Sequence, residues 1–331
     1  MASHPQTKLI LTLLSLTAAA ALSLVWSLSR GSLPLSVSEL WQAWSHTGPE
    51  PLLAQQLITE LRLPRALSAF AVGGLLALAG ALMQTLLRNP LADPYVLGIS
   101  GGAAVGALSA MLLGLGSFWL TSGSVLGALL SMLLVFSLAH GSGSWTSNRL
   151  LLTGVVISAG WTALISFMLA VSADNTLRGM LFWLMGDFGQ SGNPTVALLT
   201  LGIGVLLCLP LARNLTLLGR GELQAQALGV NVTRLRWSIY FIAALLTAVA
   251  VTQAGSIGFI GLVVPHLIRL LLGNDQRLLL PASVLLGGTL LLCADTLART
   301  VIAPQQLPVG VITAMLGVPV FLYLLRRGNH P

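Results

Sequence analysis

Besides serines and threonines, four polar side chains stand inside the apolar runs of the chain: Gln84, Gln253, His266 and Arg269. Side chains of this kind are costly in lipid, so we expect them to face neighbouring helices or a water-filled path. Gln84 is our candidate for lining such a path. His266 could hold a metal ion, but a lone histidine without a partner is more often a hydrogen-bonding residue of the packed interior. We therefore assign neither a metal site nor a catalytic residue to this chain.

Arginines near the ends of apolar runs are the second group that could do chemistry, because a guanidinium group binds carboxylates. Arg62 and Arg65 stand in "LRLPR", before one apolar run, and Arg299 stands in "CADTLART", after another. Such arginines commonly anchor helix ends. Asp295 precedes Arg299 by four residues, so a local ion pair on one helix would also account for that arginine.

Arg178 stands in a long connection between two apolar runs, "ADNTLRGMLFWLMGDFGQSGNP". Near the mouth of a path, its guanidinium could meet the carboxylates of an incoming anion. A pair with Asp174, four residues earlier, would account for it equally well. Both interpretations stay open from the sequence.

The elements that position these residues must be membrane helices, because the chain is 55% hydrophobic and only 8% charged. A net charge of +7 would suggest a nucleic-acid partner in a soluble protein. Here the arginines lie at the ends of apolar runs, where they set membrane topology, and we expect no nucleic acid. Cys208 and Cys293 lie inside apolar runs, so they indicate neither a disulfide framework nor a metal cluster.

Ten apolar runs approach the roughly 20 residues that a helix needs to cross the hydrocarbon core. They cover residues 9–28, 66–87, 96–116, 118–139, 150–171, 195–212, 237–253, 256–272, 279–298 and 307–325. The first run is too long for a signal peptide, so we count it as a membrane helix. The sequence predicts an all-α, polytopic membrane protein with about ten transmembrane helices, in a single domain over residues 1–331.

The basic residues sort unevenly across these crossings if the chain starts in the cytoplasm. The inner side then carries Lys8, Arg88, Arg149, Arg213, Arg220, Arg234, Arg236, Arg269, Arg277, Arg326 and Arg327, whereas the outer side carries Arg30, Arg62, Arg65, Arg178 and Arg299. This excess on the inner side is the positive-inside bias. We expect both termini to be cytoplasmic.

The sequence holds no ATP-binding loop of the type G-x-x-x-x-G-K-[ST]. That loop requires a lysine, and the only lysine, Lys8, is followed at once by an apolar run. If ATP drives this protein, the ATPase must be another polypeptide that docks on an inward-facing surface.

The longest inward loop, residues 213–236, is the place to look for that surface. Its centre, Gly221 to Leu228, is predicted to form a short polar helix that Gly229 closes as a C-cap. An ordinary solvated connector is the alternative interpretation.

Three separated stretches resemble the permease family of bacterial ATP-driven importers for iron chelates, heme and cobalamin, the FecCD type. They are "RNPLADPYVLGISGGAAVGA" (88–107), "GSIGFIGLVVPHLIRLLLG" (255–273) and "LPVGVITAMLGVPVFLYLL" (307–325). The resemblance implies the cobalamin-permease-like fold, with an inverted repeat between helices two to five and seven to ten. It implies a homodimer in the bacterial inner membrane, with a path between the protomers lined by the second, fifth and tenth helices.

The resemblance also implies partners and roles. Two ATP-binding cassette subunits would bind ATP and Mg²⁺ and dock on the coupling segment of loop 213–236, at Gly221, Glu222, Ala225, Leu228 and Gly229. A soluble periplasmic binding protein would dock on Arg62, Arg65 and Arg299. The chain itself would be neither an enzyme nor the holder of a cofactor.

The cargo stays open between heme, a ferric siderophore and cobalamin, with iron chelates favoured by overall similarity. An ion-coupled secondary transporter is the less favoured alternative. That class normally needs acids embedded in the membrane, and none of the nine acids stands in the middle of an apolar run.

Overall fold

The computed structural model describes residues 5–31, 35–45, 53–139, 147–189 and 192–328, and every regular element in those ranges is a helix. Seven of these helices are long and apolar enough to span a membrane: α1 (Pro5–Ser29), α4 (Leu63–Leu86), α6 (Ser117–Ala139), α7 (Ser147–Val171), α9 (Thr195–Arg220), α11 (Val232–Ala254) and α13 (Gln276–Thr300). Three shorter apolar helices join them: α5 (Ile99–Leu112), α12 (Ile260–Leu272) and α14 (Val309–Gly328). The expected all-α, polytopic fold of about ten transmembrane helices is confirmed.

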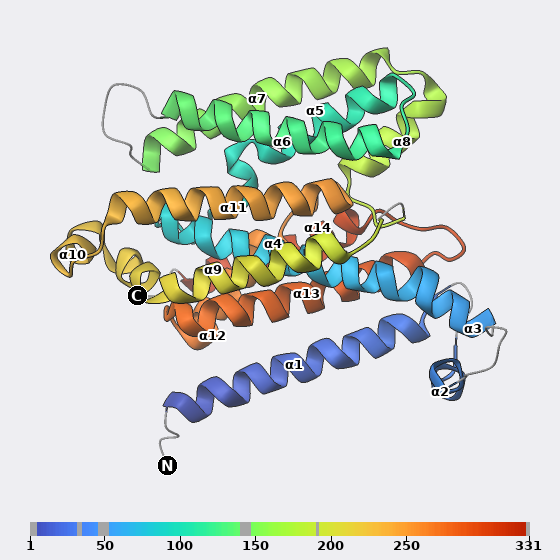
Figure 1. Ribbon diagram of the computed structural model, residues 1–331, viewed down its shortest axis with the longest axis horizontal. Helices are drawn as coiled ribbons and strands as arrows, with labels where there is room; N and C mark the ends of the chain where they lie inside the picture. Colours follow the sequence, from blue (N-terminus) through green and yellow to red (C-terminus); the bar gives the residue numbers. More distant parts are fainter. Residues whose placement is uncertain (1–4, 32–34, 46–52, 140–146, 190–191, 329–331) are drawn as a thin grey trace.

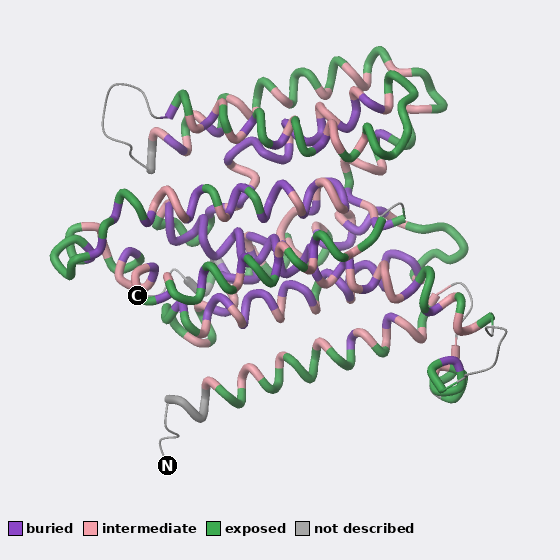
Figure 2. The backbone as a smooth tube through the Cα atoms, viewed as in Figure 1, coloured by how far each residue is buried: buried purple, intermediate pink, exposed green. Residues whose placement is uncertain are grey.

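The helices form a bundle around α4 (Figure 1). Helices α9, α11, α12 and α13 contact α4 directly, and its side chains are almost all buried (Figure 2). Helix α1 packs on α13 at one flank, and α5, α6 and α7 form a layer at the other, beyond α11 (Figure 1). Most apolar side chains of α1 and α7 are exposed, as expected for helices that meet lipid or another chain.

The two ends of the bundle differ. The first described residues, the C-terminal end and α10 (Glu222–Ala227) lie at one end, here called the α10 end (Figure 1). The short helices α2 (Val37–Ser45) and α3 (Leu53–Gln56) lie at the other, the α2 end, where the π-helix η1 (Leu57–Arg62) leads into α4. The first and last described residues therefore share an end, as an even number of crossings requires.

Glycines let helix backbones meet within this bundle. A Cβ at Gly102 would collide with the carbonyl of Gly127, and one at Gly106 would collide with the carbonyl of Gly123. These contacts bring α5 against α6, because small residues let helix backbones approach closely in a membrane protein. Gly80 of α4 likewise faces the backbone of Gly261 in α12.

The chain between α11 and α12 is not helical, so its peptide groups need partners within the protein. The Tyr95 hydroxyl, in the 3-10 helix η2 (Pro94–Leu97), accepts a hydrogen bond from the Ile257 N–H and donates one to the Ile257 carbonyl, both at 3.0 Å. Two distant connections, one before α5 and one before α12, are thus held together. They also share a backbone feature, because the residue preceding each helix, Gly98 or Phe259, has φ of +71°. This is a local similarity between the two halves that the sequence did not reveal.

The structure corrects two expectations about connections. Residues 213–236 are not one loop, because α9 continues to Arg220 and α11 begins at Val232. The long connection around Arg178 contains a helix, α8 (Asp174–Leu184). Part of each predicted connection is therefore helical: residues 213–220 extend α9, and α8 and α10 are short separate helices.

Candidate functional site

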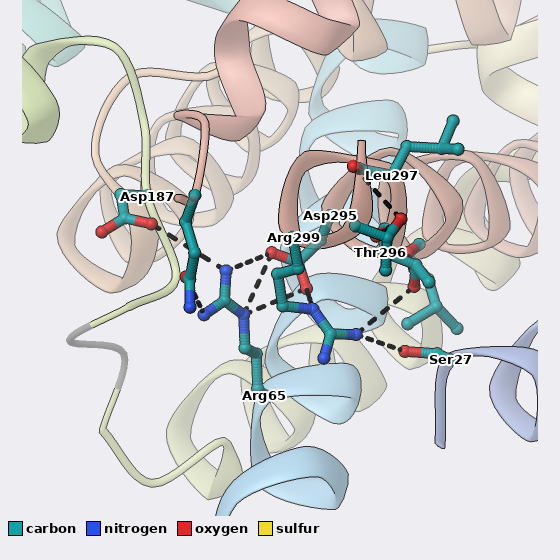
Figure 3. Close-up of polar contacts among 10 residues, drawn as sticks. Ser27, Arg65, Asp187, Asp295, Thr296, Leu297 and Arg299 are labelled. Carbon is teal, nitrogen blue, oxygen red and sulfur yellow. Dashed lines mark hydrogen bonds and ion pairs between the residues drawn. The ribbon is translucent and has the colours of Figure 1, made fainter. Parts of the chain in front are cut away.

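Two arginines predicted to dock a partner converge at the α2 end on one carboxylate, that of Asp295 (Figure 3). Arg65 lies in the first turn of α4. Its Nε is 3.1 Å from both oxygens of Asp295, and its Nη2 is 2.8 Å from Oδ1. Its Nη1 donates to Oε1 of Gln306 at 3.0 Å. A guanidinium held by two nitrogens on a carboxylate is fixed in direction as well as position.

Arg299 reaches the same carboxylate from one turn further along α13. Its Nε is 3.2 Å from Oδ2 of Asp295, so the ion pair suggested by the four-residue spacing is present. Its Nη2 donates to the Ser27 hydroxyl at 3.0 Å. The cluster therefore ties together α1, α4 and α13.

The carboxylate at the centre of this cluster is fully buried, with no exposed side-chain area. A buried carboxylate is tolerated only when partners replace the water that it loses. Arg65 and Arg299 supply that replacement. Asp187, which follows α8, lies 4.0 Å from Nη2 of Arg65 and adds a second, weaker attraction (Figure 3).

Arg62, the last residue of η1, is buried as well, and its Nη1 donates to the Leu28 carbonyl at 2.6 Å. All three arginines thus have partners within the chain, as the expected pair of Asp295 with Arg299 shows for one of them. They line the wall of a cavity of about 350 Å³ at the α2 end. Glu60 is the one acidic residue among the described residues that line it. A carboxylate that enters this cavity would meet the guanidinium groups of Arg65 and Arg299, which already bind the carboxylate of Asp295.

The short helix expected near Gly221 is present as α10, and its end has the predicted geometry. Gly229 has φ of +81°, its N–H donates to the Gln226 carbonyl at 2.9 Å, and the Val230 N–H donates to the Ala225 carbonyl at 3.0 Å. These two bonds form a Schellman motif, in which the left-handed residue is usually glycine.

The surface of α10 differs from the one proposed from the sequence. Ala225 is fully buried and cannot contact a partner, which corrects its assignment to the docking surface. Glu222 is held by Nη2 of Arg236 at 2.7 Å. Leu223 was not predicted, yet it is 81% exposed, and Leu228 is 66% exposed. These two exposed apolar side chains, one in the first turn of α10 and one directly after its last residue, are the feature that best fits a protein partner.

The two residues assigned to a path have different positions. Gln84 is buried inside the bundle, where its Nε2 donates to the Leu262 carbonyl at 3.0 Å, so it does not lie on a free face and that assignment is corrected. Arg178 is exposed on α8, and its guanidinium lies 5.7 Å from the ring centre of Phe182. Among the described residues it forms no ion pair with Asp174, so that alternative is not realised.

Comparison with known proteins decides the family. The family model described as the FecCD transport family matches residues 19–327. The chain belongs to the FecCD transport family. This protein is therefore a permease of the kind found in ABC importers, and it is a multi-pass membrane protein.

Named relatives of this FecCD permease differ in the cargo that their names give. The hemin transport system permease protein HmuU of Yersinia pestis is 41% identical, covering 91% of each chain. The vitamin B12 import system permease protein BtuC of Vibrio cholerae is 42% identical, covering 89% of each chain. The molybdate import system permease protein MolB of Haemophilus influenzae is 35% identical, covering 96% of each chain.

A solved structure of similar fold is described as an inward-facing conformation of a metal-chelate type ABC transporter. It is 34% identical to this FecCD permease, with a TM-score of 0.84, and the match covers 95% of this chain and 98% of the other. The helix arrangement is therefore that of a solved ABC transporter.

Proposed function

We propose that this FecCD permease is the translocation subunit of an ATP-driven importer that moves an iron chelate, heme or a ferric siderophore, from the periplasm to the cytoplasm. One observation carries the proposal beyond the family: the bundle has a feature suited to a protein partner at each end. The arginine cavity lies at the α2 end, and the exposed Leu223 and Leu228 belong to α10 and its C-cap. Helices α2 and α10 lie at opposite ends of the bundle (Figure 1). Import by this mechanism needs one partner on each side of the membrane.

The α10 end would face the cytoplasm of a bacterial cell, with both termini, in the inner membrane. Two ATP-binding cassette subunits would dock there, bind ATP and Mg²⁺, and perform the hydrolysis, while this chain performs no catalysis. Leu223 and Leu228 would enter the interface, and Gly221 and Gly229 would set the ends of α10. Glu222 would act inside the chain, by holding α10 to α11 through Arg236.

The α2 end would receive the periplasmic binding protein. A carboxylate of that protein would be attracted by Arg62, Arg65 and Arg299 across the cavity. Because Asp295 already offsets part of this charge, the contact would guide orientation more than it adds affinity.

A homodimer would bury the exposed faces of α7 and α14, and the path would run between them. Thr162 and Ser166 are exposed on α7, where hydroxyl groups could line a route for a polar cargo. Helix α4 corresponds to the second predicted membrane helix, which was expected to line the path. It is too deeply buried to do so, and would instead pack behind the helices that line it.

The identity of the cargo is the most specific part of the proposal. Cobalamin is the alternative to an iron chelate. Uptake into proteoliposomes would test it, using the binding protein and ATPase encoded beside this chain. Heme, a ferric siderophore and cobalamin would be offered in turn. Uptake of heme or the siderophore would support an iron-chelate importer. Uptake of cobalamin alone would show that the protein imports cobalamin and not an iron chelate.

An ion-coupled secondary transporter has less support. Such a transporter needs an acid that gains and loses a proton or binds an ion during the cycle. Asp295 is a fully buried carboxylate, but Arg65 and Arg299 hold it at the α2 end. It lacks the freedom of a coupling residue.

A further inference from the structure

We propose that Arg88 and Arg220 form, beside α10, a binding site for an acidic side chain of the ATPase subunit. This inference rests on the proposed function, since it takes the ATPase as the partner at the α10 end. It assigns a charged contact to residues outside the coupling segment that the sequence indicated.

The site is an open cavity of about 580 Å³. Its lining includes Leu223, Gln224 and Gln226 of α10, together with Arg88 and Arg220. Arg88 follows the end of α4, whereas Arg220 is the last residue of α9, so two distant parts of the chain each contribute an arginine to the lining of one cavity.

The charge of this cavity is positive and uncompensated. Glu222 is the acidic residue among those that line it, and its carboxylate is already taken by Arg236 at 2.7 Å. Arg88 and Arg220 are both exposed, and neither is within 4.0 Å of a carboxylate among the described residues. Two unpaired guanidinium groups at one opening attract a carboxylate from another molecule.

The backbone at Arg88 is a second observation. Its φ is +48°, in the left-handed region that usually selects glycine. The turn itself is an ordinary helix end, because the Asn89 N–H donates to the Gln84 carbonyl at 3.1 Å, as it would with glycine at residue 88. An arginine therefore occupies a backbone conformation that is costly for a residue with a side chain, and residues held in such conformations cluster at functional sites.

The residues around Arg88 and Arg220 favour an acidic side chain of a protein over a lipid headgroup as the anion that binds there. Leu223, which is 81% exposed on α10, lines the same cavity. Arginine beside an exposed apolar side chain is typical of the centre of a protein interface. In addition, α10 projects beyond the ends of α9 and α11, away from the membrane-spanning part of the bundle (Figure 1).

The test measures binding of the purified ATPase subunit to this chain in nanodiscs made of neutral lipid. Replacing both arginines, Arg88→Glu with Arg220→Glu, should weaken binding at least about tenfold at low salt, with a smaller salt dependence than the unmodified chain. Arg213→Glu is the matched control, because Arg213 is exposed on α9 but does not line the cavity. Arg88→Gly keeps the turn and removes the cation, so it should give a smaller loss of the same kind.

Unchanged binding in the double variant, or an equal loss in the Arg213→Glu control, would overturn the proposal. So would a loss that appears only in nanodiscs containing anionic lipid, because the site would then bind a lipid headgroup. If the unmodified chain fails to bind the ATPase at all, the proposed function itself is wrong, which is a different result from a failure of the arginine site.

Discussion

Arg65 and Asp295 are 230 residues apart in the chain, yet the Nε and Nη2 of the arginine both bind the carboxylate, which is closed to solvent. Arg299 binds the same carboxylate from α13 and reaches Ser27 of α1. These contacts hold α1, α4 and α13 together at the α2 end. They also set the positions of two arginines that line the cavity where we propose that a binding protein docks.

Asp295→Ala should lower the free energy of unfolding by about 3 kcal/mol, because it leaves two largely buried guanidinium groups without their carboxylate. Unfolding of the purified chain in detergent, followed by circular dichroism against denaturant, measures the change. The control is Asp174→Ala, since Asp174 is exposed and forms no ion pair among the described residues. Equal stability of the two variants would show that the cluster does not brace the bundle.

Arg178→Glu should lower uptake several-fold while leaving the affinity of the binding protein nearly unchanged. Arg178 is exposed on α8 and lies outside the arginine cavity, so its charge can act on an anionic cargo without forming the docking site. Uptake and binding-protein affinity are measured on the same preparation, with Arg178→Lys as the variant that keeps the charge. Normal uptake by Arg178→Glu would remove this residue from the path.

Gly80→Ala should lower the free energy of unfolding by about 2 kcal/mol, because the added Cβ would collide with the backbone of Gly261 and must push α4 from α12. The matched variant is Gly202→Ala, in α9, where a Cβ meets nothing within 4 Å. That change should leave stability unchanged or raise it, since alanine favours a helix over glycine. The same denaturation assay compares the two, and a loss confined to Gly202→Ala would contradict the packing described here.

The number and type of spanning helices could be predicted because each one needs a long apolar run, which the sequence shows directly. Helix ends were harder. The sixth apolar run was predicted to end at residue 212, but α9 continues through Pro210 to Arg220. A proline removes one backbone hydrogen bond, and the helix on either side of it can remain intact when neighbouring helices pack against it.

The candidate sites could be predicted only where the signal is local. The cap at Gly229 follows from a short pattern, and so does the pair of Asp295 with Arg299. The contact between Arg65 and Asp295 has no local signal, because it depends on how α4 packs against α13. Burial of Ala225 and exposure of Leu223 depend in the same way on which face of α10 meets α9.

Leu223→Ala should weaken ATPase binding about tenfold, because the interface would lose the burial of an apolar side chain that is exposed in the free chain. Titration of the ATPase against the chain in nanodiscs gives the dissociation constant. Asn274→Ala serves as the comparison, since Asn274 is an exposed residue of the connection between α12 and α13 and is not part of α10. If both variants bind like the unmodified chain, α10 does not dock the ATPase through this residue.

The most direct test of the central claim is the energy source of uptake. Proteoliposomes would hold this chain with its ATPase and binding protein, and uptake of the accepted cargo would be compared with ATP, with a non-hydrolysable analogue, and with an imposed proton or sodium gradient alone. The proposed function predicts uptake with ATP and none with the analogue or the gradient. Uptake that follows the gradient and ignores hydrolysis would contradict it.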